Sequence, residues 1–199
     1  MKTYEAIGIS GTPDWNQIPE TPIDHYLWSD VRSIRAFAQF CWEPDALHVR
    51  LRAVEPNILS RYDGLLDPVF CDSCLEFFFC PGSDDRYFNF ECNPKGSLYV
   101  GFGKANPQRA RLYREDWKSL LQTQPFTTDD GWGISLRIPA SFIRWFVPDF
   151  KPAAGLTLRG NFFKCGDETL QPHYMSWNRV ESATPCFHLP AFFGNIVLK

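Results

Sequence analysis

The strongest constraint on the fold is an alternation of apolar and polar residues that recurs along the chain. In the segment 47–54, Val49, Leu51 and Ala53 alternate with histidine and arginine residues. The segments 87–93 and 132–138 alternate in the same way. Because successive side chains of a β-strand point to opposite faces, this period of two predicts strands with one buried face.

Further apolar runs bounded by turn residues bring the number of expected strands to about nine, whereas helical patterns are confined to 115–121 and 141–146. Many short strands with little helix predict an all-β sandwich or barrel, and 199 residues fit a single domain over 1–199. The expected strands cover 35–42, 47–54, 74–80, 87–93, 98–102, 132–138, 156–165, 173–177 and 195–198.

The segment 104–131 lacks this alternation and is rich in polar residues. We expect a long solvated connection there, with a ligand-contacting loop as the alternative.

Charge and composition exclude several classes of function. The net charge is −3 and the isoelectric point is near 5.8, so the chain offers no broad basic surface for nucleic acid.

No run of about 18 uncharged apolar residues predicts a membrane span, and no apolar stretch follows the first lysine as in a signal peptide. We therefore expect a cytoplasmic protein that binds neither nucleic acid nor membrane.

The cysteine pattern favours free thiols over disulfides or zinc. Seven cysteines are an odd number, and they accompany no export signal. Cys71 and Cys74 have the spacing of a zinc knuckle, but no second pair with matching spacing follows. We therefore expect buried free thiols and no metal.

Polar groups on the predicted strands suit a polyhydroxylated ligand. One face of 87–93 carries Tyr87, Asn89, Glu91 and Asn93 at every second residue. A sugar needs aromatic rings for its C–H faces and fixed donors and acceptors for its hydroxyls. The row predicts a sugar-binding face.

Glu76 lies inside a very apolar strand, while Arg159 and Asn161 share one face of another. A buried carboxylate needs a partner, so Glu76 either pairs with an arginine such as Arg159 or contacts a ligand.

The aromatic residues divide by position. We expect Trp15, Trp28, Trp42 and Trp132 to pack in the core or at an edge. Phe70, Trp177 and Phe187 instead flank turns or the rim of the predicted sheet, where a ring can face solvent. His173 alternates with Met175 and Trp177, so these three should share a face. His173 is then either a structural residue or a ligand contact, and His188 has the same two interpretations.

Catalytic motifs are missing from the sequence: we find no nucleophile elbow, phosphate-binding loop or His-Glu-x-x-His pair. The enzymatic alternative is glycoside hydrolysis by two carboxylates, for which Glu76 and Glu91 are the candidates.

Several blocks, in order, resemble the family 9 carbohydrate-binding modules from about Ile34 to the C-terminus. Each block alone has low specificity, but their order and spacing strengthen the match. They are Phe40-Cys41-Trp42-Glu43-Pro44-Asp45-Ala46-Leu47-His48-Val49-Arg50-Leu51, Asp72-Ser73-Cys74-Leu75-Glu76-Phe77-Phe78, Tyr87-Phe88-Asn89-Phe90-Glu91-Cys92-Asn93, Trp132-Gly133-Ile134-Ser135-Leu136-Arg137-Ile138-Pro139, His173-Tyr174-Met175-Ser176-Trp177 and Phe193-Gly194-Asn195-Ile196-Val197-Leu198.

The resemblance implies a jelly-roll-like antiparallel β-sandwich with few short helices that binds glucose-type or xylose-type sugars without cleaving them. It also implies an aromatic clamp, whose usual tryptophans are replaced here by Phe70 and Phe187. Glu76, Asn89, Glu91 and Asn161 match further polar positions of the family. Some members hold structural calcium; no clear cluster of acidic residues here matches that property, and structural calcium stays an alternative.

The sequence therefore predicts non-catalytic binding of a mono- or oligosaccharide, with no cofactor. A glycoside hydrolase and an accessory sandwich with a vestigial site are the alternatives, and the identity of the sugar and the oligomeric state stay open. The predicted sugar-binding residues are Phe70, Glu76, Asn89, Glu91, Arg159, Asn161, His173, Trp177 and Phe187.

Overall fold

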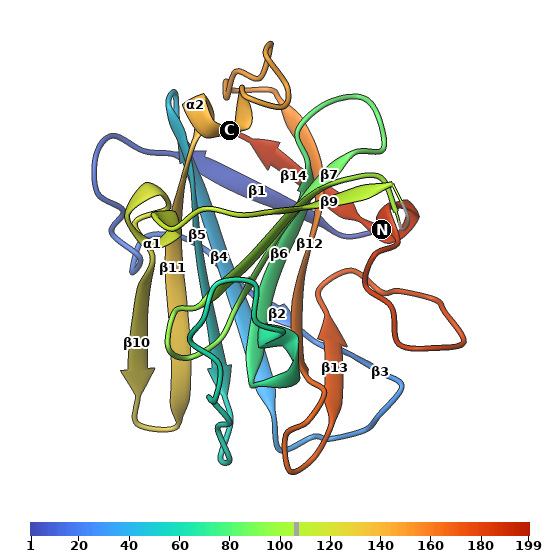
Figure 1. Cartoon of the computed structure of the whole chain (residues 1–199). Coiled ribbons are helices and arrows are strands. Elements are labelled where there is room, and N and C mark those ends of the chain that lie inside the picture. Colours follow the sequence, from blue (N-terminus) through green and yellow to red (C-terminus); the bar gives the residue numbers. More distant parts are fainter. Residues whose placement is uncertain (106–107) are drawn as a thin grey trace.

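A computed structural model describes residues 1–105 and 108–199, and within them the chain forms fourteen strands in two stacked sheets (Figure 1). Sheet A holds β3 (His25–Leu27), β6 (Cys74–Cys80), β7 (Tyr87–Cys92), β8 (Leu98–Gly103), β9 (Arg109–Leu112), β12 (Thr157–Gly166), β13 (His173–Ser176) and β14 (Gly194–Leu198). Sheet B holds β2 (Glu20–Ile23), β4 (Arg35–Glu43), β5 (Ala46–Val54), β10 (Gln124–Thr128) and β11 (Gly131–Pro139).

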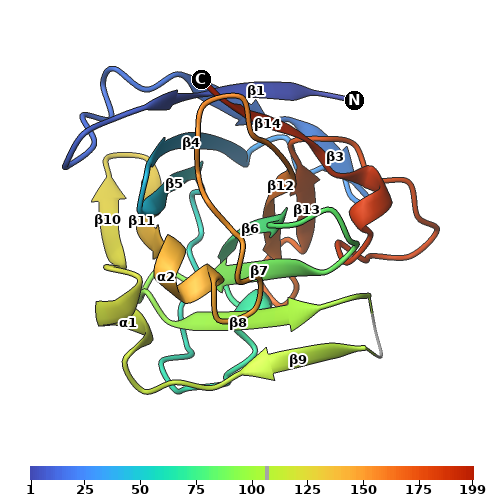
Figure 2. The same cartoon turned by 90° about the horizontal axis from the view of Figure 1, so that it is seen from above.

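The strand β1 (Thr3–Gly8) joins the two sheets. Its first half pairs in parallel with β14, and Ile7 and Gly8 then pair in parallel with β4 (Figure 2). The other described pairings are antiparallel. With β1 included, the strand order is β10-β11-β5-β4-β1-β14-β12-β6-β7-β8-β9. The fold is therefore the all-β antiparallel sandwich that the alternation and the resemblance predict.

The core lies between the sheets and is built from the apolar face of each strand. Phe77 of β6 stacks on Phe79 and on Phe162 of β12, with ring centroids 5.1 Å apart in both pairs. Phe40 of β4 meets Phe77 from the opposite sheet at 5.6 Å. Burying a ring of this size stabilises the fold by about 1.5–3 kcal/mol, so these contacts hold the two sheets together.

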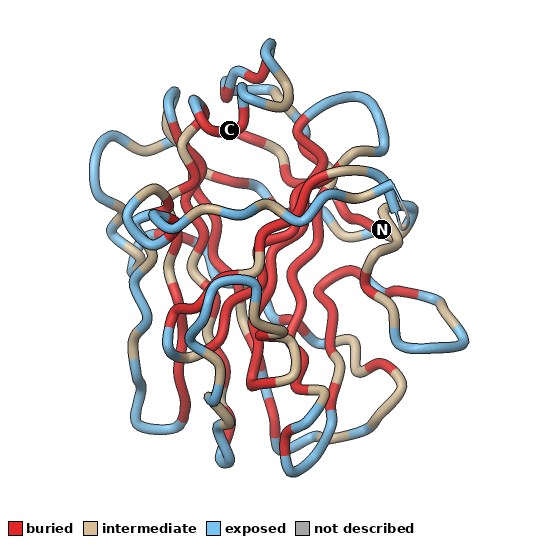
Figure 3. Tube along the Cα trace, viewed as in Figure 1, coloured by how far each residue is buried: buried red, intermediate tan, exposed pale blue. Residues whose placement is uncertain are grey.

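The outer face of sheet A is also covered, which corrects the expectation that 87–93 is half-buried. All six residues of β7 are buried, as are all seven of β6 (Figure 3). A second apolar cluster, which includes Phe78, Tyr87 and Phe193, lies on this outer face. Loops far apart in the sequence fold over the sheet there, and alternation within a strand cannot reveal such a cover.

All nine predicted strands are present, and both helical patterns correspond to short helices, α1 (Trp117–Leu120) and α2 (Ala140–Ile143). The expectation of a solvated connection over 104–131 is wrong for its described part, which contains β9, α1 and β10 and buries Trp117 and Leu121. Residues 106 and 107 lie outside the described part. Among the described residues, the helices are too short to span a bilayer.

Candidate functional site

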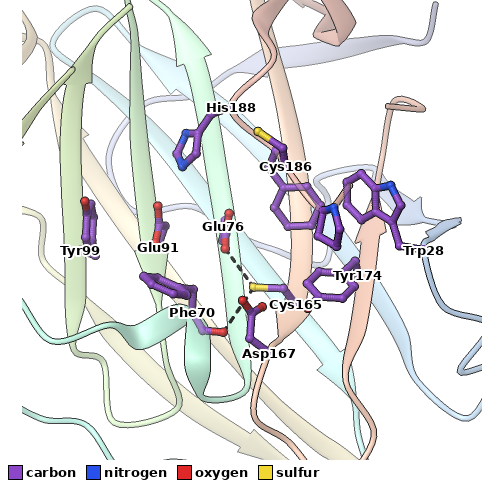
Figure 4. Close-up of a pocket in the computed structure, with 12 residues that line it drawn as sticks. Trp28, Phe70, Glu76, Glu91, Tyr99, Cys165, Asp167, Tyr174, Cys186 and His188 are labelled. Atoms are coloured by element: carbon purple, nitrogen blue, oxygen red, sulfur yellow. Dashed lines mark hydrogen bonds between the residues drawn. The ribbon is translucent and has the colours of Figure 1, made fainter. Parts of the chain in front are cut away.

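The floor of the candidate site is a row of polar side chains across the outer face of sheet A. Glu76 of β6 stands directly opposite Glu91 of β7, and Glu91 stands opposite Tyr99 of β8. Because neighbouring residues such as Phe77 and Phe90 point into the core, alternation turns these three outward. Figure 4 shows the three side chains side by side on adjacent strands.

Aromatic side chains stand around this floor and enclose a cavity of about 180 Å³. Phe70 comes from the 3₁₀ helix η1 (Val69–Cys71), and Phe187 comes from the loop before β14. The cavity is lined by Trp28, Phe70, Glu76, Glu91, Tyr99, Cys165, Asp167, Tyr174, Pro185, Cys186, Phe187 and His188 (Figure 4).

Backbone hydrogen bonds fix the loop that carries Phe70. The Asp72 carboxylate accepts bonds from the backbone N–H groups of Arg61 and Tyr62, at 2.8 and 3.0 Å. The N–H of Asp167 donates to the carbonyl of Phe70 at 3.2 Å, which ties η1 to the end of β12. The Phe70 ring therefore has a defined place beside the floor.

Phe187 is held by stacking on sheet A. Its ring lies 4.2 Å from that of Phe163, with the planes 13° apart, and 5.8 Å from that of Trp28. Only 8% of Phe187 is exposed. The ring is thus both a wall of the cavity and part of the outer apolar cluster.

Three carboxyl groups meet in the cavity, and their surroundings change their acidity. Burial, and next the neighbouring Glu91, raise the pKa of Glu76 well above its ordinary value. Burial raises the pKa of Glu91 to about 7 and, together with the adjacent Glu168, that of Asp167 to about 6. Near neutral pH the cavity therefore offers protonated carboxyl groups that donate and ionised ones that accept.

Asn89 lies beside the floor and orients Glu91. Its Nδ2 donates to the Glu91 carboxylate at 2.6 Å, and the residue is fully buried. On the next strand, a Cβ at Gly101 would come within 2.5 Å of the Asn89 Oδ1 and 2.6 Å of an Arg109 nitrogen. The glycine therefore makes room for these polar groups beside Glu91.

Arg159 and Asn161 do not reach the cavity, although they share a strand with Cys165. The guanidinium of Arg159 pairs with Asp85 at 3.3 Å, so the alternative in which Arg159 pairs with Glu76 is wrong. In the sheet Arg159 stands opposite Cys80, four residues and roughly 13 Å along β6 from Glu76.

Asn161 supports the loop that carries Phe187. Its Nδ2 donates to the Asn178 carbonyl at 2.9 Å, and its Oδ1 accepts the Asn178 N–H at 2.8 Å. Asn178 in turn donates to the carbonyl of Phe192 at 2.8 Å. Asn161 thus lies behind the cavity wall.

His173 and Trp177 are brought to the interior between the sheets, so the expectation of a rim position for Trp177 is wrong. His173, Met175 and Trp177 are each 1% exposed and share the face that the alternation predicts. Trp177 packs on Phe162 at 5.6 Å. The intervening Tyr174 is the residue that turns outward and lines the cavity.

His173 belongs to a buried ionic network that links the two sheets. The Lys164 ammonium lies 3.2 Å from the Glu55 carboxylate and 2.7 Å from the His173 Nε2. Glu55 also accepts bonds from the Trp132 indole and the Ser73 hydroxyl, both at 2.8 Å. Burial, and next the charge of Lys164, lower the pKa of His173 to about 4, so it is neutral near pH 7.

Sequence reasoning missed several residues of the cavity. Trp28, expected to pack in the core or at an edge, lines it instead, and its indole donates to the Ser182 carbonyl at 2.7 Å. Tyr99 and Tyr174 could have been found from strand alternation, whereas Asp167 lies in a turn that carries no pattern. The His188 ring stacks near Phe78 at 5.1 Å and hydrogen-bonds the Tyr87 hydroxyl at 3.0 Å.

One group of side chains at the floor has metal-ligating atoms close together. In the part of the chain that the structure describes, the single cluster of at least three such residues is Cys74, Glu76 and Cys165. Two thiols and a carboxyl do not form the all-oxygen environment that calcium prefers.

Comparison with known proteins finds a matching family and similar solved structures. The family model described as carbohydrate-binding family 9 matches residues 11–198. A protein of Bacteroides uniformis ATCC 8492 proposed to bind carbohydrate is 27% identical, with a TM-score of 0.87 over 100% of this chain and 99% of that one. A comparison with curated proteins finds no match.

Two further solved structures share the fold. Both are family 9 carbohydrate-binding modules from Caldicellulosiruptor kristjanssonii and are 15% identical to this chain. The complex with cellotriose has a TM-score of 0.71 over 100% of this chain and 94% of that one. The complex with glucose has a TM-score of 0.70 over 100% and 96%.

Proposed function

Because the chain belongs to carbohydrate-binding family 9, we propose that it binds a glucose-type or xylose-type mono- or oligosaccharide without cleaving it. The proposed site is the cavity between Phe70 and Phe187, above Glu76 and Glu91. The observation that carries this proposal is that aromatic walls and a carboxyl floor line one cavity.

The two kinds of lining match the two kinds of sugar surface. A pyranose ring presents apolar C–H groups, which stack on aromatic faces, and hydroxyl groups around its edge, which need donors and acceptors. Glu76, Glu91 and Asp167 supply both, because their pKa values differ. Tyr99 and Tyr174 add aromatic surface with polar tips.

The family comparison supports the same ligand class. The two modules from Caldicellulosiruptor kristjanssonii hold cellotriose and glucose. The clamp here is built from phenylalanines, which present a smaller face than tryptophan, so we expect modest affinity for a single sugar unit.

The family match favours binding over hydrolysis for the two floor carboxyl groups. A glycosidase needs carboxyl groups that flank the scissile bond, one to protonate the leaving group and one to attack or activate water. Glu76 and Glu91 are direct cross-strand neighbours on one floor, and the chain belongs to a carbohydrate-binding family. We therefore propose that they accept and donate hydrogen bonds to hydroxyl groups.

Thermal denaturation with a sugar panel tests the proposal. Glucose, cellobiose and xylobiose are compared with buffer alone, and binding raises the midpoint through linkage. At a hundred times Kd the stabilisation is about 2.7 kcal/mol, which corresponds to a rise of about 5–10 °C for a chain of this size. No shift with any sugar would favour the vestigial sandwich.

A matched pair of variants assigns the site. Glu91→Gln keeps the shape of a carboxyl group that burial already holds partly neutral, so the fold should persist. The affinity for sugar, measured by titration calorimetry, should fall. Glu5→Gln changes an exposed carboxyl of β1 that does not line the cavity, and its affinity should equal that of the parent. Equal affinities for all three proteins would reject this cavity as the site.

A further inference from the structure

We propose that Cys74, Glu76 and Cys165 form a binding site for a thiophilic divalent cation such as Zn²⁺ at the floor of the cavity. The proposal rests on the placement of three ligand atoms and does not depend on sugar binding. The Cys74 and Cys165 thiols and a Glu76 carboxyl oxygen all lie within 4.8 Å of one another.

Sheet register creates this cluster. Cys74 of β6 and Cys165 of β12 are directly opposite each other in an antiparallel pair, so their side chains leave the sheet on the same side. Glu76 follows Cys74 by two residues and therefore shares that face. The Cys165 thiol already donates to the Glu76 carboxylate at 3.0 Å (Figure 4).

The spacing suits tetrahedral zinc. Two sulfurs that each lie about 2.3 Å from a tetrahedral zinc ion are roughly 3.8 Å apart, so the two sulfurs must approach each other by about 1 Å at most. The Cys165 sulfur and the Glu76 oxygen, now 3.0 Å apart, must separate by roughly 0.5 Å. Thiolates select zinc and other soft cations over calcium and magnesium, and a carboxylate is a regular third zinc ligand.

The surroundings give the cation a path and leave one coordination position open. Glu76 and Cys165 line the cavity, whereas Cys74, opposite Cys165 on the neighbouring strand, is fully buried. A cation held by three protein ligands would thus face the cavity with its fourth position.

Charge also favours a cation. Glu91 and Asp167 line the same cavity, and each adds negative charge when it is ionised. Zinc binding replaces the protons of the two thiols and of the Glu76 carboxyl with one cation, which balances most of the new negative charge.

Cobalt substitution tests the site with a signal that only sulfur ligands produce. The full chain is reduced, stripped of metal with a chelator, and titrated with Co²⁺ and then Zn²⁺. We expect sulfur-to-cobalt charge-transfer absorption and tetrahedral d–d bands that saturate at about one equivalent, and zinc should abolish both. Absence of this absorption while a thiol assay shows reduced cysteines would overturn the proposal.

Variants locate the ligands. Cys74→Ser and Cys165→Ser should each lose most of the charge-transfer intensity, and Glu76→Gln should weaken cobalt affinity at least about tenfold. Cys41→Ser is the matched control, because Cys41 is equally buried but lies on β4 in the other sheet. Far-ultraviolet circular dichroism confirms that each variant is folded, and Cys74→Ala and Cys165→Ala replace any variant that is not.

Two further outcomes would count against the site. Equal loss of intensity in Cys41→Ser would mean that the metal is held elsewhere. A disulfide between Cys74 and Cys165 in the freshly purified protein, detected by mass spectrometry, would show that these sulfurs pair with each other instead.

Discussion

Replacing Phe187 by leucine should weaken sugar binding and leave the fold intact, whereas replacing it by alanine should damage both. Phe187 is 8% exposed and stacks on Phe163 at 4.2 Å, so most of the ring is structural and only an edge meets the cavity. Leucine retains most of the buried volume but has no aromatic face for a C–H surface. Aromatic contacts contribute about 0.5–1.5 kcal/mol beyond area burial, so Phe187→Leu should bind about 2- to 13-fold more weakly.

The alanine variant gives the structural part of the effect. Truncation of a buried phenylalanine destabilises a protein by about 3–5 kcal/mol, which for this length lowers the melting midpoint by about 6–20 °C. Phe187→Ala should show this loss in denaturant titration even without sugar. A change below about 1 kcal/mol would mean that the ring is not packed as described.

Titration calorimetry with the best sugar of the panel measures the binding part, and Phe193→Leu is the control. Phe193 is 1% exposed, belongs to the same outer cluster and packs on Tyr87 at 5.5 Å, but it does not line the cavity. Parent and Phe193→Leu proteins should bind equally. Equal weakening in both leucine variants, or none in Phe187→Leu, would refute the role assigned to Phe187.

Two further predictions concern stability. Lys164→Met should lower the free energy of unfolding in urea by about 3–5 kcal/mol, because it leaves Glu55 buried without its counter-charge. Adding Glu55→Gln should recover part of this loss. A stability of Lys164→Met within about 0.5 kcal/mol of the parent would contradict this prediction. Burial, and next the positive Arg109, lower the pKa of His188 to about 4 from an ordinary 6.5. As the pH falls, the unfolded chain therefore binds a proton at His188 before the folded chain does. The contribution of neutral His188 to the free energy of unfolding is complete above pH 6.5 and falls by up to about 3 kcal/mol towards pH 4. The stability difference between parent and His188→Gln should shrink by that amount over this range, and a difference that stays constant would show that His188 titrates normally.

The sequence predicted the strands of the sandwich well because each long strand has at least one face against a core. Short strands were missed for the opposite reason. β9 and β10 lie at the ends of the strand order, and most of their residues are exposed or half-buried, so they lack a clear apolar face. β1 divides its pairing between two sheets, and its alternation was not distinctive.

For the candidate site, alternation predicted which residues share a face but not which face is outside. Glu76 and Glu91 were expected together and stand opposite each other in register. His173 and Trp177 also share a face, but it is the interior one, because Tyr174 takes the outward position. Trp28 lines the cavity through the folding of a loop over sheet A, and local sequence carries no signal for such long-range contacts.

The most direct test of the proposed function is a crystal structure of the protein grown with cellobiose. We predict one glucose unit between the rings of Phe70 and Phe187, with hydroxyl groups within hydrogen-bonding distance of Glu76, Glu91 or Asp167. A sugar bound on another surface, or an unchanged cavity without sugar at a saturating concentration, would contradict the proposal.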